Sequence, residues 1–150
     1  MHGAVWQPLQ CYLAERVVVA LDMPGHGPDE RDDPCLTDIP SMAAYVSSCL
    51  DHDRSESVIL MGHSMGALVA LAAASHQCVS AVVLLGAAAA MPVNAALLQQ
   101  ARDDVSGAQD NILKWGIHKS CPHAADIRAF LKPVMQDTND MALYTDLFAC

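Results

Sequence analysis

Uninterrupted apolar runs mark three segments in the first part of the chain. They lie within residues 16–21, 57–61 and 81–85, of which only Arg16 and Ser57 are not apolar, and each is rich in Val, Ile or Leu. Continuous runs of this kind are typical of strands that are buried on both faces of a parallel sheet. The pattern therefore predicts three strands.

Apolar residues at helical spacing separate these strands. The repeat i, i+3, i+4, i+7, i+8 of an amphipathic helix is formed by Met42, Tyr45, Val46, Cys49 and Leu50. An Ala/Leu-rich segment at residues 67–74 predicts a second helix. Strands that alternate with helices indicate a parallel sheet with right-handed crossovers.

From residue 93 onward the spacing is helical, and no further strand is predicted. Three helices are expected around residues 98–105, 127–135 and 141–148. The sequence therefore predicts an α/β fold with a mostly parallel sheet of about three strands flanked by helices. We place this partial core in residues 1–92 and a helical cap, or lid, in residues 93–150.

One short segment is a candidate catalytic motif. Gly62, His63, Ser64, Met65 and Gly66 match the pattern G-x-S-x-G and stand between a predicted strand and a predicted helix. An abrupt strand-to-helix turn strains the central residue and makes its side chain project. The N–H groups at the start of the following helix can stabilise an oxyanion. The pattern predicts a nucleophilic serine. The alternative is a Gly-rich strand-to-helix turn whose serine has no catalytic role.

Composition narrows the range of functions. With 150 residues, 53% of them hydrophobic and 17% charged, the chain is long and apolar enough for one domain with a core. Its net charge of -9 would repel a phosphate backbone, so we expect no binding of nucleic acid.

No apolar stretch approaches about 20 unbroken residues, so no membrane span is expected. The start of the chain lacks a signal-peptide pattern, which favours the cytoplasm, and the oligomeric state stays open.

The cysteines and histidines give no clear metal pattern. Six cysteines are scattered without a C-x-x-C pair, and we interpret them as reduced thiols, with disulfides or a metal site as alternatives. His118, Cys121 and His123 come nearest to ligand spacing, but a polar turn is the simpler interpretation. We predict no metal and no cofactor.

Three segments together resemble the α/β-hydrolase superfamily, in the branch with a helical cap and a G-H-S-M-G elbow. His2-Gly3 followed by Trp6 is similar to the oxyanion loop of that family. Residues 18–27 resemble its D-x-P-G-x-G turn, and residues 58–66 resemble the strand that carries the nucleophile elbow.

The resemblance implies roles for individual residues. Ser64 would be the nucleophile, and the backbone N–H groups of Met65 and Ala4 would be the oxyanion donors. The elbow would be shaped by Gly62, His63 and Gly66, and the neighbouring turn by Asp22, Pro24, Gly25 and Gly27. The implied reaction is acyl transfer from a small-molecule ester or related acyl compound to water.

The chain also departs from the family pattern. The family carries strands before the oxyanion loop and two more after the cap, bearing an acid and the catalytic histidine, and none of these is recognisable here. We therefore expect an incomplete chain whose general base lies elsewhere. Alternatives are an acyltransferase, thioesterase, C–C hydrolase or cofactor-free haloperoxidase, or a truncated non-catalytic chain that binds a ligand or partner.

The missing strands bear on the sheet. In the family, the strand before the oxyanion loop lies between the strand that ends at Asp22 and the strand that ends at Met61. Without it, we expect residues 17–21 to pair directly with residues 58–61. Because unpaired strand edges promote association, we also expect aggregation in solution.

Overall fold

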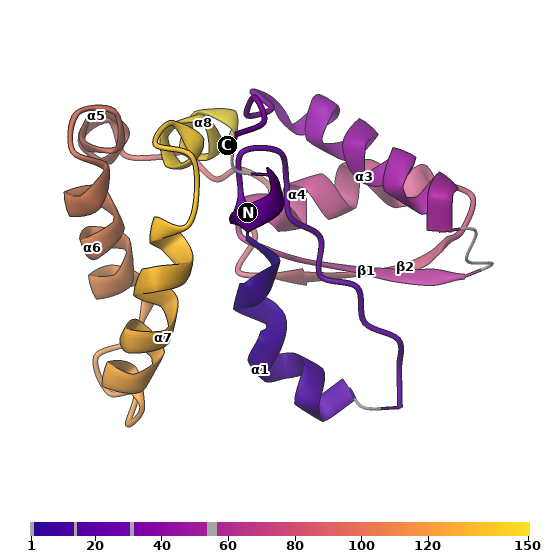
Figure 1. Cartoon of the computed structure of the whole chain (residues 1–150), viewed down its shortest axis with the longest axis horizontal. Coiled ribbons are helices and arrows are strands. Elements are labelled where there is room, and N and C mark those ends of the chain that lie inside the picture. The colour runs from indigo at the N-terminus through magenta and orange to yellow at the C-terminus, as the bar shows by residue number, and fades with distance from the viewer. Residues whose placement is uncertain (1, 14, 31, 54–56) are drawn as a thin grey trace. The chain divides into compact units, whose positions relative to one another are not determined.

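The computed structural model describes residues 2–13, 15–30, 32–53 and 57–150 and divides into two compact units. The first unit is built from segments 1–35 and 95–144, and the second from segments 36–94 and 145–150. Each unit is described by itself (Figure 1). The division into a core of residues 1–92 and a cap of residues 93–150 remains a prediction.

The second unit contains the sheet. Its elements are α3 (Ile39–Asp53), β1 (Val58–His63), α4 (Met65–Ala72), the 3₁₀ turn η3 (Ala73–Ser75) and β2 (Val79–Leu85). The strands are parallel, and Ile59 lies opposite Ala81 and Leu60 opposite Val82. The two strands and two helices predicted from residues 42–85 are thereby confirmed.

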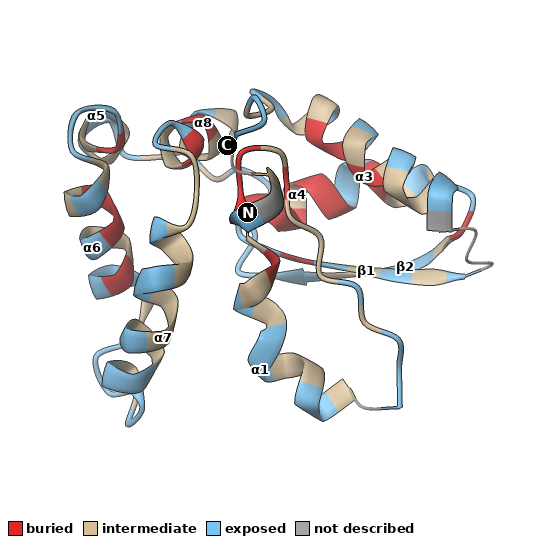
Figure 2. Cartoon of the chain, in the orientation of Figure 1, coloured by how far each residue is buried: buried red, intermediate tan, exposed pale blue. Residues whose placement is uncertain are grey.

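Helix α4 forms the centre of the second unit. It contacts both strands and also α3, and Figure 1 shows both helices on one side of the strands. Figure 2 shows that α4 is largely buried. Its small side chains allow this close packing; the buried residues of the two helices and η3 include Met42, Ala43, Val46, Ala67, Val69, Ala70 and Ala73.

The strands are not buried on both faces, contrary to the expectation from their continuous apolar sequence. Ile59 is 59% exposed and Met61 38% exposed, whereas Leu60 between them is half-buried. Successive side chains of a strand point to opposite faces, so Leu60 faces the helical side and its neighbours face away. The unit therefore has one open, apolar sheet face.

The third predicted strand does not form. Residues 17–22 carry no strand structure, Val17 is 96% exposed and Val19 is 66% exposed. In the described part of the chain, the sheet has only β1 and β2, so direct pairing of residues 17–21 with residues 58–61 was wrong. The preference of β-branched residues for strands depends on packing and on a hydrogen-bonded neighbouring strand, and in the described part of the chain no strand pairs with residues 16–21.

The first unit is helical. Near the start of the chain it contains η1 (Gly3–Trp6), α1 (Gln7–Gln10), η2 (Cys11–Leu13) and α2 (Gly27–Glu30). It continues with α5 (Ala95–Asp103), α6 (Val105–Gly116), α7 (Ala124–Gln136) and α8 (Ala142–Ala149), the last of which runs into the second unit. The helices expected around residues 127–135 and 141–148 are confirmed.

Two helices stand where one was predicted around residues 98–105. Asp104 separates α5 from α6, and its carboxylate accepts a hydrogen bond of 3.0 Å from the Gly107 N–H. An aspartate at this position caps the N-terminus of a helix, so the chain ends one helix and starts the next. Helix α6 then packs on α7, where Gln109 Nε2 donates a 2.7 Å hydrogen bond to the Met135 carbonyl.

None of the described helices is long and apolar enough to cross a membrane.

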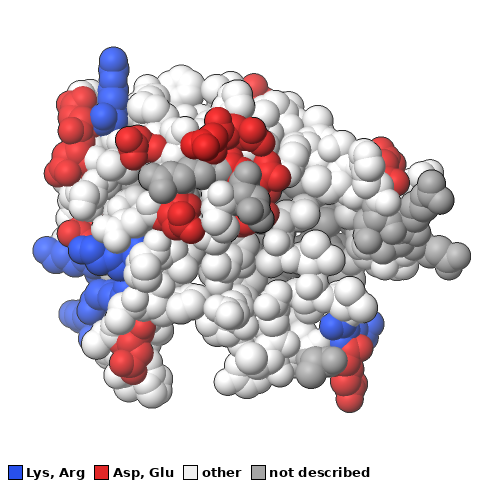
Figure 3. Space-filling view, in the orientation of Figure 1, with Lys and Arg blue, Asp and Glu red and all other residues white. Residues whose placement is uncertain are grey.

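Charge is unevenly placed on the surface. On the face shown in Figure 3, Asp and Glu side chains outnumber Lys and Arg, and most of the basic side chains lie over α5–α7. This agrees with the net charge of -9.

Candidate functional site

Ser64 is the one residue between β1 and α4. Its backbone has φ 53° and ψ -125°, and no other non-glycine residue in the described ranges has a positive φ. The Ser64 N–H donates a 2.9 Å hydrogen bond to the Leu85 carbonyl, and the Ser64 carbonyl accepts one of 2.9 Å from the Ala67 N–H. These bonds hold the residue in a conformation that costs about 1–3 kcal/mol. Ser64 itself is exposed.

The glycines of the elbow are needed because two backbone segments nearly touch. A Cβ on Gly62 would lie 2.0 Å from the Gly66 carbonyl oxygen and 2.6 Å from the Ala67 nitrogen. Only glycine fits such an approach. The His63 ring lies near Gly86. A Cβ placed on Gly86 would be 3.1 Å from Nε2 of His63.

The start of α4 offers a hydrogen-bond donor beside the serine. The Ser64 side chain makes no capping bond to the helix. In the described part of the molecule, the N–H of Met65 has no partner. The first N–H groups of a helix also carry its positive dipole end, so an anion next to Ser64 would be stabilised there.

The loop predicted to supply the second donor lies in the first unit. The Ala4 N–H donates a 3.2 Å hydrogen bond to Nδ1 of His2, and the Gly3 N–H donates to the Asp22 carboxylate. The His2 ring also lies 3.2 Å from Asp22 and 3.6 Å from Asp137. Ala4 and Ser64 belong to different units, so the role of Ala4 stays a prediction.

The turn that follows Asp22 has the geometry expected for its glycines. Gly25 has φ 83° and Gly27 has φ 74°, both in the left-handed region. A Cβ on Gly27 would lie 2.3 Å from a carboxylate oxygen of Asp22. The prediction that this segment forms a tight turn is confirmed.

The next question is whether the described residues supply a proton acceptor for the serine. Among the residues that the structure describes, no histidine or carboxylate makes a hydrogen bond to the Ser64 hydroxyl. The two histidines considered as ligands are exposed, with His118 bonded to Ser120 at 2.7 Å and His123 lying 3.9 Å from Asp126. Over the described ranges, no three His, Cys, Asp or Glu residues gather in a metal-binding group.

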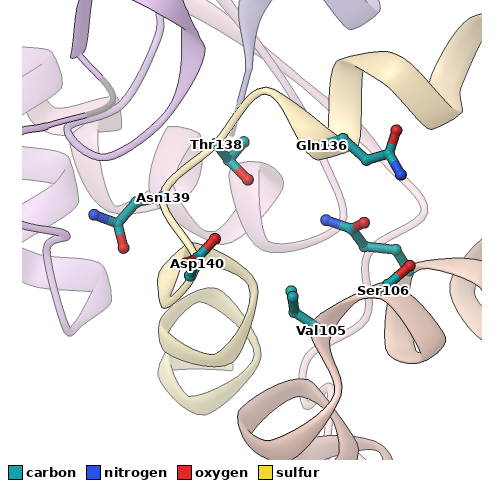
Figure 4. A pocket seen from close by; sticks show the side chains of 7 residues that line it. Val105, Ser106, Gln136, Thr138, Asn139 and Asp140 are labelled. Atoms are coloured by element: carbon teal, nitrogen blue, oxygen red, sulfur yellow. The ribbon is translucent and has the colours of Figure 1, made fainter.

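A hollow of about 210 Å³ lies in the first unit. Its walls come from the start of α6 and from the segment after α7, as Figure 4 shows. The lining is Val105, Ser106, Gln109, Gln136, Thr138, Asn139 and Asp140. None of the predicted site residues lines it.

Comparisons with known proteins agree with the fold. The sequence pattern that defines the "Alpha/beta hydrolase family" matches residues 1–149. The lipase LipV of Mycobacterium tuberculosis is 37% identical over 92 residues, which are 60% of this chain and 34% of the lipase. The match thus spans about a third of the length of that relative.

A solved structure has a similar fold. It is an α/β-hydrolase family protein from Desulfitobacterium hafniense, which superposes with a TM-score of 0.66 at 21% sequence identity. The superposition covers 99% of this chain and 64% of that one. With nearly the whole chain matched by the family pattern, this protein belongs to the α/β-hydrolase family.

Proposed function

We propose that this chain carries the nucleophile of a serine hydrolase that acts on esters or related acyl compounds, and that the nucleophile is Ser64. The observation that carries the proposal is the elbow itself. A serine with φ 53° stands alone between a parallel strand and a buried helix, and its side chain is exposed. The protein would hold this strain because the strain presents the hydroxyl to a substrate.

The proposed reaction is acyl transfer in two steps. The Ser64 oxygen attacks the ester carbonyl, and the carbonyl electrons move onto oxygen. The N–H of Met65, with Ala4 as second donor, stabilises this oxyanion. The alcohol then leaves, and water hydrolyses the acyl-serine to release the acid. The proton acceptor is proposed to be a histidine outside this chain, because none in the described part reaches the hydroxyl.

The substrate class is proposed from the same site and from one relative. The matched segment of the Mycobacterium tuberculosis protein belongs to a lipase, an enzyme that hydrolyses esters. A serine nucleophile with a backbone oxyanion donor suits an ester carbonyl. We infer a small-molecule ester substrate, with no cofactor needed for the chemistry.

The direct test is hydrolysis of p-nitrophenyl butyrate by the purified chain. We expect slow release of p-nitrophenol, because a positioned base contributes about 10²–10⁴-fold and the described residues supply none. Ser64→Ala should remove this slow reaction. Ser48→Ala is the matched control, since Ser48 is an exposed serine on α3, and it should leave the rate unchanged. Equal rates for Ser64→Ala and the unsubstituted chain would refute the proposal.

A second candidate is a chain that binds acyl compounds without hydrolysing them. One observation favours this second function: no base in the described part of the chain contacts the Ser64 hydroxyl. Calorimetry with a non-hydrolysable ester analogue separates the two functions. Binding without any Ser64-dependent release of p-nitrophenol would support the binding protein over the hydrolase.

A further inference from the structure

A cysteine, a histidine and a carboxylate form a hydrogen-bonded series in the second unit. Sγ of Cys78 lies 3.1 Å from Nδ1 of His76. Nε2 of the same ring lies 3.1 Å from Oδ1 of Asp51, near the end of α3. Cys78 directly precedes β2, whereas Ser64 follows β1. The strands are parallel, so the series lies at their N-terminal ends, whereas the elbow lies at their C-terminal ends.

The partners of the ring determine where its hydrogen lies. Nδ1 of His76 faces two donors, the Cys78 thiol and the Cys78 N–H at 3.4 Å. Nε2 faces only an acceptor, the Asp51 carboxylate. The hydrogen therefore lies on Nε2 and is donated to Asp51, and Nδ1 presents its lone pair to the thiol. Nucleophile, base and orienting carboxylate follow one another in hydrogen-bond contact.

Burial limits what can reach the sulfur. Cys78 is 9% exposed and is a free thiol. The side chain of His76 is 13% exposed and that of Asp51 is 65% exposed. The carboxylate is therefore at the surface and the cysteine is buried, so we expect only a small reagent to reach the thiol.

The backbone holds the thiol at the start of the sheet. The Cys78 carbonyl accepts a 2.8 Å hydrogen bond from the Val58 N–H, where β1 begins. The His76 carbonyl accepts one of 2.9 Å from the Val79 N–H. These bonds fix the two residues in one turn, so the sulfur and the imidazole stay within reach of one another.

We propose that Cys78 is a modification site at which a small peroxide oxidises the thiol to a sulfenic acid. The thiol proton passes to Nδ1 of His76, and the thiolate attacks one oxygen of hydrogen peroxide. The S–O bond forms as the O–O bond breaks, and the departing hydroxide takes the proton from His76 to become water. Sulfur is oxidised and the peroxide is reduced, so thiol and peroxide give sulfenic acid and water.

The contact with His76 distinguishes this thiol from that of Cys11. A nucleophile in hydrogen-bond contact with a general base reacts faster than an unassisted one, and we expect His76 to raise the rate about tenfold. Cys11 provides the comparison, because it is exposed and hydrogen-bonds to no histidine in the described ranges. Exposure alone would make Cys11 the faster thiol, whereas the cluster makes Cys78 the faster one.

The test treats the whole chain with hydrogen peroxide at neutral pH and stops the reaction with catalase. The protein is then unfolded in dimedone, so that burial does not hide any sulfenic acid, and each cysteine peptide is quantified by mass spectrometry. Cys78 should be oxidised several-fold faster than Cys11. His76→Gln should slow Cys78 about tenfold and leave Cys11 unchanged.

A second variant keeps the proposal testable if His76→Gln disturbs the turn. Asp51→Asn changes a side chain at the surface and keeps an oxygen for the Nε2–H. It should slow Cys78 several-fold with an unchanged circular dichroism melt. Oxidation of Cys78 no faster than that of Cys11, or a Cys78 rate that neither variant changes, would overturn the proposal.

Discussion

At the scale of the residue, the backbone of Ser64 is strained. A residue with a Cβ is strained at φ 53°, whereas glycine adopts this conformation without strain. Ser64→Gly should therefore be more stable than Ser64→Ala by about 1 kcal/mol, after the greater chain entropy of glycine is subtracted. Urea unfolding of the two variants measures this difference. If Ser64→Ala is the more stable of the two, the residue is not strained and the elbow geometry is wrong.

The close approach at Gly62 gives a second prediction at this scale. Gly62→Ala puts a methyl group 2.0 Å from the Gly66 carbonyl oxygen, so the elbow must open. We expect a loss of about 2 kcal/mol or more in the free energy of unfolding. Gly116→Ala is the matched control, because a Cβ there meets nothing within 4 Å, and it should be neutral or slightly stabilising. Equal melting temperatures for the two variants would contradict the steric account.

The elbow could be predicted from sequence because its requirements are local. Gly62 and Gly66 flank the serine at fixed spacing, and an apolar strand and an Ala-rich helix enclose them. The cluster of Cys78, His76 and Asp51 could not be predicted in this way. Asp51 stands 25 residues before His76 and joins it only when α3 packs on α4 and η3. Nothing in the local pattern brings the three side chains together.

At the scale of the element, the helices of the first unit are held by side-chain contacts between α6 and α7. Gln109 is 6% exposed, and its amide donates to the Met135 carbonyl. Gln109→Ala leaves a cavity and removes a buried hydrogen bond, so we expect a loss of about 1–3 kcal/mol. Lys132→Ala breaks a 2.8 Å ion pair with Asp110 that lies at the surface, and should cost under about 1 kcal/mol. Denaturant titrations should rank the two in this order, and the reverse order would contradict it.

The failed strand shows the limit of element prediction. Residues 16–21 have the composition of a buried strand as clearly as β1 does. Strand formation needs a neighbour along the backbone, and β1 pairs with β2. The run therefore forms no strand, and Val17 and Val19 are exposed. Apolar content predicts what a segment would do inside a sheet, whereas its partners decide whether it enters one.

At the scale of the whole molecule, exposed apolar surface predicts self-association. Ile59 is 59% exposed and Leu84 42% exposed, and each strand of a two-stranded sheet has an open edge. Such edges and faces pair with other copies of a chain. Light scattering during size-exclusion chromatography should show species larger than the 16.0 kDa chain. Ile59→Lys should reduce them, because a charge on the open face opposes stacking. A single sharp peak at 16.0 kDa for the unsubstituted chain would refute this prediction.

Covalent labelling shows whether Ser64 is the nucleophile. The purified chain is incubated with a fluorophosphonate, which phosphonylates nucleophilic serines, and the site is mapped by tandem mass spectrometry. We predict one slowly formed adduct on Ser64, absent from Ser64→Ala and retained in Ser48→Ala. An adduct on another serine, or none on Ser64 after prolonged incubation of the folded chain, would contradict the claim.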